Sequence, residues 1–168
     1  YYYIEIQSED EKITLPAQLI RFKGDVPDFI LAPHIFFMFL TMFFSNVSGL
    51  LAALNFSQFK RVGVLTFWCL VAGGMILGPV VQKYAFDELW AGVPFGWDLT
   101  DNKTLIAFVF WLAAFLINRK NPSRTWTIIA SIVTMIIFAI PHSMFGSELN
   151  PETGKIIQGI VYTFFNMK

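Results

Sequence analysis

The feature that most constrains this chain is an uncharged block of 23 residues, Ala32–Leu54, with the sequence APHIFFMFLTMFFSNVSGLLAAL. A helix rises about 1.5 Å per residue, so a helix of this length spans the roughly 30 Å of bilayer hydrocarbon. Pro33 suits the first turn of such a helix, where its missing N–H costs no hydrogen bond. We therefore expect Ala32–Leu54 to form the first of several membrane spans.

The composition of the chain is typical of a membrane protein with several spans. Of its 168 residues, 55% are hydrophobic and 14% are charged, whereas soluble domains carry about 25% charged residues. The single cysteine, Cys69, excludes an intrachain disulfide and a thiolate metal cluster. No basic cluster alternates with aromatic residues, so the expected partner is the lipid bilayer and not a nucleic acid.

The apolar blocks predict an all-α membrane protein, with a four-helix transmembrane bundle over residues 29–145. The spans are expected at about 32–54, 62–81, 104–117 and 125–144. The third block is short for a crossing, and we expect Lys103, Arg119 and Lys120 to extend it by reaching toward the membrane surface. Thr100-Asp101 is expected to cap the N-terminus of this third helix.

The two ends of the chain indicate structure outside the membrane. Residues 1–7 and 12–17 are strand-like runs around a polar tetrad, which predicts an N-terminal β-hairpin. A lone hairpin is marginally stable, so we expect residues 1–28 to be the tail of a larger periplasmic β-domain plus a linker. In the tail at 146–168, apolar residues at helical spacing over 155–165 predict an interfacial helix.

The charged residues predict the orientation of the bundle. The short loops at 55–61 and 118–124 hold five Lys and Arg residues and no Asp or Glu. All twelve acidic residues fall in the N-terminal segment, the loop at 82–103 and the tail. By the positive-inside rule the basic loops face the cytoplasm. We therefore expect a multi-pass protein of a bacterial inner membrane, with both termini in the periplasm.

Two features predict contacts with other membrane subunits. Gly74 and Gly78 form a GxxxG spacing in the second span, which lets another helix approach closely or admits a flat cofactor ring. The loop at 82–103 is rich in aromatic residues, which favour the headgroup region of a bilayer. We expect other subunits to bind at the Gly74/Gly78 face and at this loop.

The two histidines are the candidate ligands for a cofactor or metal. His34 lies near the outer end of the first span and His142 near the outer end of the fourth. Each ends a stripe of mostly polar residues at helical spacing. The stripes are His34, Met38, Thr41, Ser45 and Ser48, and Thr127, Ser131, Thr134, Phe138 and His142. Polar side chains in lipid pack against one another, so we expect the stripes to face each other.

Three interpretations of the histidine pair stay open. The histidines can be interfacial residues that bond to water, to carboxylates or to backbone freed by Pro33 and Pro141. They can be the axial ligands of a b-type haem held between the first and fourth helices. The third interpretation is a copper site with Met38 or Met144 as a thioether ligand, or a single histidine on the magnesium of a chlorophyll.

Two functions are consistent with these features. The first is a non-catalytic membrane subunit or anchor of a larger assembly, such as a respiratory or photosynthetic electron-transfer complex. The second is a bis-histidine haem b electron carrier that uses His34 and His142 between quinol and a periplasmic acceptor. The sequence contains no nucleophile motif, so we assign no catalytic residue.

Several motifs carry a family resemblance. They are QKYAFDELWAGVPFGWDLTDNKT at 82–104, APH at 32–34, IPHS at 140–143 and GSEL at 146–149. With these motifs the chain resembles a family of bacterial inner-membrane proteins that have a periplasmic β-sandwich followed by four transmembrane helices. The resemblance covers residues 16–150 and is consistent with a truncated β-domain at the N-terminus. It implies no activity and no site residue.

Overall fold

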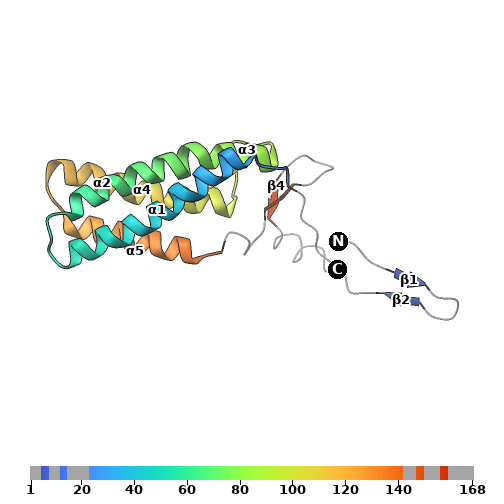
Figure 1. Cartoon of the computed structure of the whole chain (residues 1–168), viewed down its shortest axis with the longest axis horizontal. Coiled ribbons are helices and arrows are strands. Elements are labelled where there is room, and N and C mark those ends of the chain that lie inside the picture. Colours follow the sequence, from blue (N-terminus) through green and yellow to red (C-terminus); the bar gives the residue numbers. More distant parts are fainter. Residues whose placement is uncertain (1–4, 8–11, 15–22, 142–146, 150–155, 159–168) are drawn as a thin grey trace.

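The computed structural model describes residues 5–7, 12–14, 23–141, 147–149 and 156–158 of the chain. In this part, four helical runs pack side by side as an elongated bundle (Figure 1). Helix α1 contacts the second and fourth runs, and the third run contacts the same two neighbours. Three of the four runs are long and apolar enough to cross a membrane, as expected of a multi-pass membrane protein.

The first run is helix α1, Asp28–Ala53, which begins before the Ala32 expected from the sequence. Pro33 therefore lies inside the helix, in its second turn, and not in the first turn. A proline at this position removes the N–H that would donate to the carbonyl of Phe29. That carbonyl lies in the first turn of α1, so only one hydrogen bond near the helix end is lost. The helix therefore continues past Pro33.

The second run is continuous from Phe59 to Phe86 and consists of α2 (Phe59–Leu70), the π-helical segment η1 (Val71–Leu77) and α3 (Gly78–Phe86). In η1 the N–H of Gly78 donates to the carbonyl of Gly73, five residues earlier. The next residue, Pro79, has no N–H, and in a regular helix its ring would clash with the carbonyl four residues earlier. A local π-helical widening accommodates such a residue.

The third and fourth runs are α4 (Leu99–Lys120) and α5 (Arg124–Ala139). Helix α4 is longer than the apolar block 104–117 because charged and polar residues extend it at both ends. Helix α5 has 16 residues and ends before the expected limit at 144. The reason is Pro141, which favours an extended conformation in the preceding residue, and Ile140 has ψ 115. Residues 142–144 lie outside the described part.

Two short antiparallel strand pairs are described outside the helices. Strand β1 (Glu5–Gln7) pairs with β2 (Lys12–Thr14), with Ile6 opposite Ile13. Strand β3 (Ser147–Leu149) pairs with β4 (Ile156–Gln158), with Glu148 opposite Ile157. The prediction of an interfacial helix over 155–165 is wrong at β4, where the chain forms a strand. The reason is that β-branched isoleucines after a turn-rich segment favour a strand. The larger periplasmic β-domain stays a prediction.

The core of the bundle lies between α2, α4 and α5. Trp111 is 1% exposed, and it belongs to one buried cluster with Phe67 and Leu70 of α2 and Ala130 and Ile137 of α5. The rings of Phe67 and Phe115 stack with centroids 4.5 Å apart. Large apolar side chains also cover the outside of the bundle, among them Phe36, Phe39, Phe43, Trp68 and Ile132. An apolar exterior of this extent suits a hydrocarbon environment.

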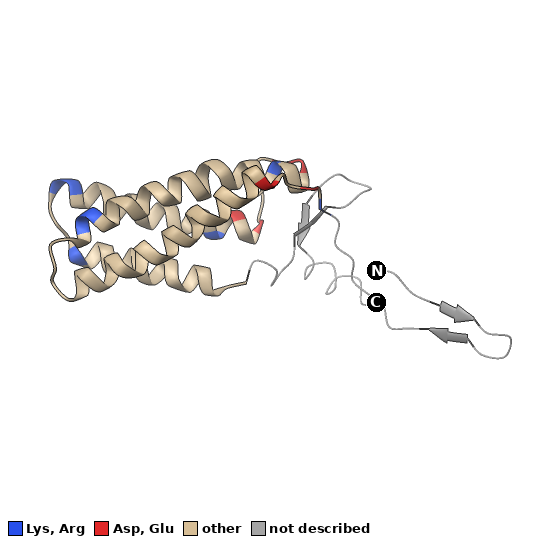
Figure 2. Cartoon of the chain, viewed as in Figure 1, with Lys and Arg blue, Asp and Glu red and all other residues tan. Residues whose placement is uncertain are grey.

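The charges of the described residues separate along the bundle (Figure 2). The end where α1 meets α2 and α4 meets α5 carries Lys and Arg and no described acid. The described Asp and Glu residues lie at the opposite end, together with Lys23, Lys83 and Lys103. We call these the basic end and the acidic end. The middle of the bundle is free of charge among the described residues (Figure 2).

Candidate functional site

His34 on α1 is held by the π-helical segment of the second run. Its Nδ1 lies 2.9 Å from the carbonyl oxygen of Gly73. A carbonyl can only accept, so Nδ1 carries the proton and Nε2 is the free acceptor of the neutral ring. Metal-ligating histidines are commonly oriented in this way by a backbone carbonyl. The second predicted ligand, His142, lies outside the described residues, so the predicted pair remains a prediction.

The space beside the glycines of η1 is filled by the chain itself. A Cβ added to Gly73 would lie 2.8 Å from Cβ of Phe37, and one added to Gly74 would lie 2.7 Å from Cγ2 of Thr104. These glycines therefore let α1 and α4 approach the second run closely. They leave no gap for a flat ring beside Gly73 and Gly74. Gly78 is half-buried, and its added Cβ would meet no atom closer than 3.6 Å, so a partner subunit at the Gly74/Gly78 face stays a prediction.

The hydroxyl residues of both polar stripes lie inside the bundle, where α1 contacts α5. The prediction that the stripes face each other is confirmed only at Ser131, which lies against α1, because Ser48 bonds to the start of α2 and Thr127 and Thr134 bond to residues of α4. Thr41, Ser45 and Ser48 on α1 are fully buried, and Thr127, Ser131 and Thr134 on α5 are at most 7% exposed. Gly49 brings the helices together, because a Cβ there would lie 2.6 Å from Cβ of Ser131. The two stripes are the polar interior of the bundle.

Hydrogen bonds within the chain account for most of these hydroxyl groups. Thr41 donates to the carbonyl of Phe37, and Ser48 donates to that of Phe59. Thr134 accepts from Nε1 of Trp111 at 2.9 Å and donates to the carbonyl of Ala130. Ser45 is buried, and its Oγ has no partner among the described residues. The stripes thus act mainly in packing.

The acidic end is organised by carboxylates at the start of α4. Asp98 is the N-cap, accepting from the N–H groups of Thr100 at 2.9 Å and Asp101 at 3.0 Å. The predicted cap at Thr100-Asp101 is therefore displaced, because both residues already belong to the helix. Asp101 instead turns back to the loop and accepts from the N–H of Ala91 at 2.6 Å. Both carboxylates are buried.

Lys103 is buried, whereas the sequence predicted that its side chain reaches the membrane surface. Its side chain is 4% exposed, and Nζ donates to the carbonyl of Ile140 at 2.8 Å. The lysine therefore satisfies a carbonyl at the end of α5, where cations are favoured by the helix dipole. At the same end Lys83 bonds to Asp87 at 2.7 Å, which lowers the pKa of this exposed carboxyl.

The loop between α3 and α4 is fixed at its base and apolar at its tip. Asn102 accepts from the N–H of Val93 at 2.8 Å, and Trp90 donates to the carbonyl of the same residue. At the tip, the side chains of Phe95 and Trp97 are 84% and 82% exposed. Exposed aromatic rings on a loop held by hydrogen bonds fit the prediction that this loop lies in the headgroup region of the bilayer.

Asn46 is an exposed amide in the middle of an apolar helix surface. It lies in a shallow groove of about 510 Å³ along α1, among Phe39, Phe43 and Leu50. It is seven residues from the C-terminal end of α1, so it lies about 10 Å along the helix from that end. Asn46 is not among the site residues predicted from the sequence. The feature that could have identified it is its offset of five residues from Thr41, which places its amide on a different face of the helix from the polar stripe.

Comparison with known proteins finds no matching family model, no similar curated sequence and no similar solved structure. The functional argument therefore rests on the chain's own geometry. In the described residues no group of three or more His, Cys, Asp or Glu side chains is placed to hold a metal ion.

Proposed function

We propose that this chain is a non-catalytic membrane subunit that anchors a larger assembly in a bacterial inner membrane. The observation that carries the proposal is Asn46. An amide without a hydrogen-bond partner costs roughly 4–8 kcal/mol in hydrocarbon. Transmembrane helices satisfy such groups by bonding to a neighbouring helix. The occupant we propose is a transmembrane helix of another subunit, with a hydrogen-bonding side chain at the depth of Asn46.

The surroundings of Asn46 support a helix as its partner. The flanking rings of Phe36, Phe39 and Phe43 are 59–63% exposed and line one face of α1. Their groove is long and shallow, which suits a packed helix better than a compact ligand. No described helix of this chain covers that face.

The segregated charges support the orientation of the subunit. With the basic end in the cytoplasm, the acidic end and the loop tip at Phe95 and Trp97 face the periplasm (Figure 2). Both chain ends then lie on the periplasmic side. A periplasmic β-domain before residue 28 fits this orientation.

A photo-crosslinking experiment in native membranes tests the proposed partner. A photoreactive amino acid in place of Phe43 should crosslink to a second membrane protein and give one product of defined mass. With Asn46→Leu we expect roughly 3- to 20-fold less product, since interhelical hydrogen bonds in membranes contribute about 0.6–1.7 kcal/mol. Asn46→Gln, which keeps the amide, should retain most of the product.

Asn121→Leu is the matched control, because Asn121 is an exposed amide outside the apolar part of α4. It should leave crosslinking unchanged. A product with the mass of two copies of this chain would identify self-association and would contradict the proposed hetero-oligomer. Products containing only lipid would contradict the subunit proposal altogether.

The second candidate function is the bis-histidine haem b electron carrier. The orientation of His34 by Gly73 favours it, because the bond leaves Nε2 available as a ligand. The filled space beside Gly73 and Gly74 counts against a ring at that position. A reduced-minus-oxidised spectrum of protein purified from haem-replete cells tests it. A sharp α-band that is lost in both His34→Ala and His142→Ala would support the carrier, and a flat spectrum would eliminate it.

A further inference from the structure

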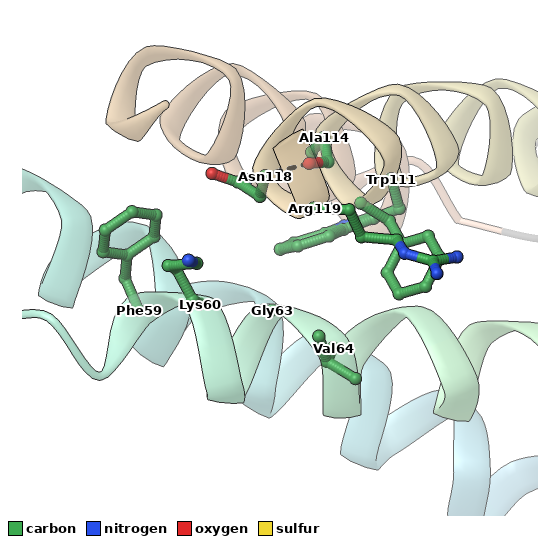
Figure 3. Close-up of a pocket in the computed structure, with 9 residues that line it drawn as sticks. Phe59, Lys60, Gly63, Val64, Trp111, Ala114, Asn118 and Arg119 are labelled. Carbon is green, nitrogen blue, oxygen red and sulfur yellow. Dashed lines mark hydrogen bonds between the residues drawn. The ribbon is translucent and has the colours of Figure 1, made fainter. Parts of the chain in front are cut away.

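The basic end contains a cavity that the anchoring function does not use. It lies between α2 and α4 and has a volume of about 220 Å³ (Figure 3). Trp111, Gly63 and Ala114 form its inner part, and Val64 and Phe115 form apolar walls. Lys60 and Arg119 line it from opposite helices, one on α2 and one on α4. We refer to it as the basic pocket.

The two cations of the basic pocket have no acidic counterpart nearby. The loops at 55–61 and 118–124 contain no Asp or Glu, and the described acids lie at the other end of the bundle (Figure 2). The guanidinium carbon of Arg119 lies 5.7 Å from the ring centroid of Phe115. This cation–π contact uses none of the guanidinium N–H groups in a hydrogen bond, so these groups can bind an oxyanion.

The backbone beside Arg119 is held in place by Asn118. The amide nitrogen of Asn118 donates to the carbonyl of Ala114 at 2.8 Å and to Oγ1 of Thr127 at 3.0 Å. Its Oδ1 accepts from the N–H of Ser123 at 2.7 Å. Asn118 is therefore a positioning residue that fixes the turn between α4 and α5. The basic pocket is preorganised on one side by this turn.

We propose that the basic pocket binds one anionic phospholipid, with its phosphate between Lys60 and Arg119 and the start of an acyl chain against Val64 and Phe115. The combination of two cations with apolar walls fits an amphiphile better than a free phosphate ion. The pocket lies at the helix ends, where lipid phosphates are found, and basic pockets between transmembrane helices bind such headgroups. Its volume is below the roughly 300–1,000 Å³ of pockets for drug-sized ligands, and so it suits a headgroup.

Native mass spectrometry of the full chain in detergent tests this proposal. With added phosphatidylglycerol we expect one tightly retained lipid per chain, and with phosphatidylcholine we expect none. The double variant Lys60→Gln/Arg119→Gln should lower the phosphatidylglycerol affinity about thirtyfold, on the basis of two phosphate-facing charges. Both side chains are exposed, so the variant is expected to fold.

The matched control is Arg61→Gln/Lys120→Gln, which removes the same charge from neighbouring positions that do not line the pocket. It should change the affinity by less than about threefold, because it leaves both pocket cations in place. An equal loss in both double variants would show general attraction to the basic end and would overturn the proposal. Retention of inorganic phosphate alone, in lipid-free detergent, would replace the lipid by a free anion.

Discussion

Replacing Trp111 with alanine is expected to lower the free energy of unfolding of the bundle by about 3–5 kcal/mol, the usual cost of truncating a large buried aromatic residue. Trp111 is 1% exposed and lies at the centre of the core between α2, α4 and α5. Its removal leaves a cavity that the surrounding helices cannot fill. Unfolding by SDS in mixed micelles measures the effect.

Two further variants separate the causes of this loss. Trp111→Phe keeps most of the ring but removes the bond from Nε1 to Thr134, and should cost about 1 kcal/mol. Trp68→Ala is the matched control, because Trp68 is 57% exposed on the outside of the bundle. Its ring makes edge-to-face contacts with Phe67 and Phe115, so we expect a loss of about 1 kcal/mol, well below that of Trp111→Ala. Equal losses at Trp111 and Trp68 would contradict the core described above.

Gly49→Ala is expected to destabilise the contact between α1 and α5 by about 1–3 kcal/mol. The added Cβ would lie 2.6 Å from Cβ of Ser131, so the two helices must move apart. This cost opposes the gain of about 1 kcal/mol that alanine brings within a helix. The same SDS titration measures the net change.

A pair of second-site variants tests the geometry of this contact. The atoms nearest to the added Cβ are Oγ and then Cβ of Ser131. In the Gly49→Ala background, Ser131→Gly removes both atoms and should recover most of the stability, whereas Ser131→Ala removes only Oγ and should recover less. Gly78→Ala is the control for the substitution itself, because the nearest atom to its added Cβ is 3.6 Å away. Recovery with neither serine variant would show that α1 and α5 do not meet at Gly49.

Much of the helical architecture could be predicted from the sequence because long apolar blocks leave few alternatives. The blocks located all four helical runs, and helical spacing grouped the hydroxyl residues that are buried inside the bundle. The helix ends were less predictable. Pro33 lies within α1 and not in its first turn, and Asp98 caps α4 in place of Thr100-Asp101. Such ends are decided by single hydrogen bonds, which periodicity does not encode.

The contacts between distant segments could not be predicted from local patterns. The bond of Lys103 to Ile140 joins residues on different helices, and an exposed position near a helix end was the simpler expectation. The π-helical segment arises from Pro79 acting on the preceding turns, and the sequence offers several ways to absorb that proline. The basic pocket is lined by residues of both α2 and α4, so it depends on how the two helices pack, which the sequence of either helix alone does not specify.

The most direct test of the central claim, a four-span bundle with its basic end in the cytoplasm, is cysteine labelling in intact cells. Single cysteines are introduced in a Cys69→Ser background, as Phe95→Cys, Glu148→Cys, Ser57→Cys and Ser123→Cys. An impermeant thiol reagent should label the first two in intact cells, and the last two only after permeabilisation. Labelling of Ser57→Cys in intact cells would invert the bundle, and protection of Glu148→Cys would show that α5 does not cross the membrane.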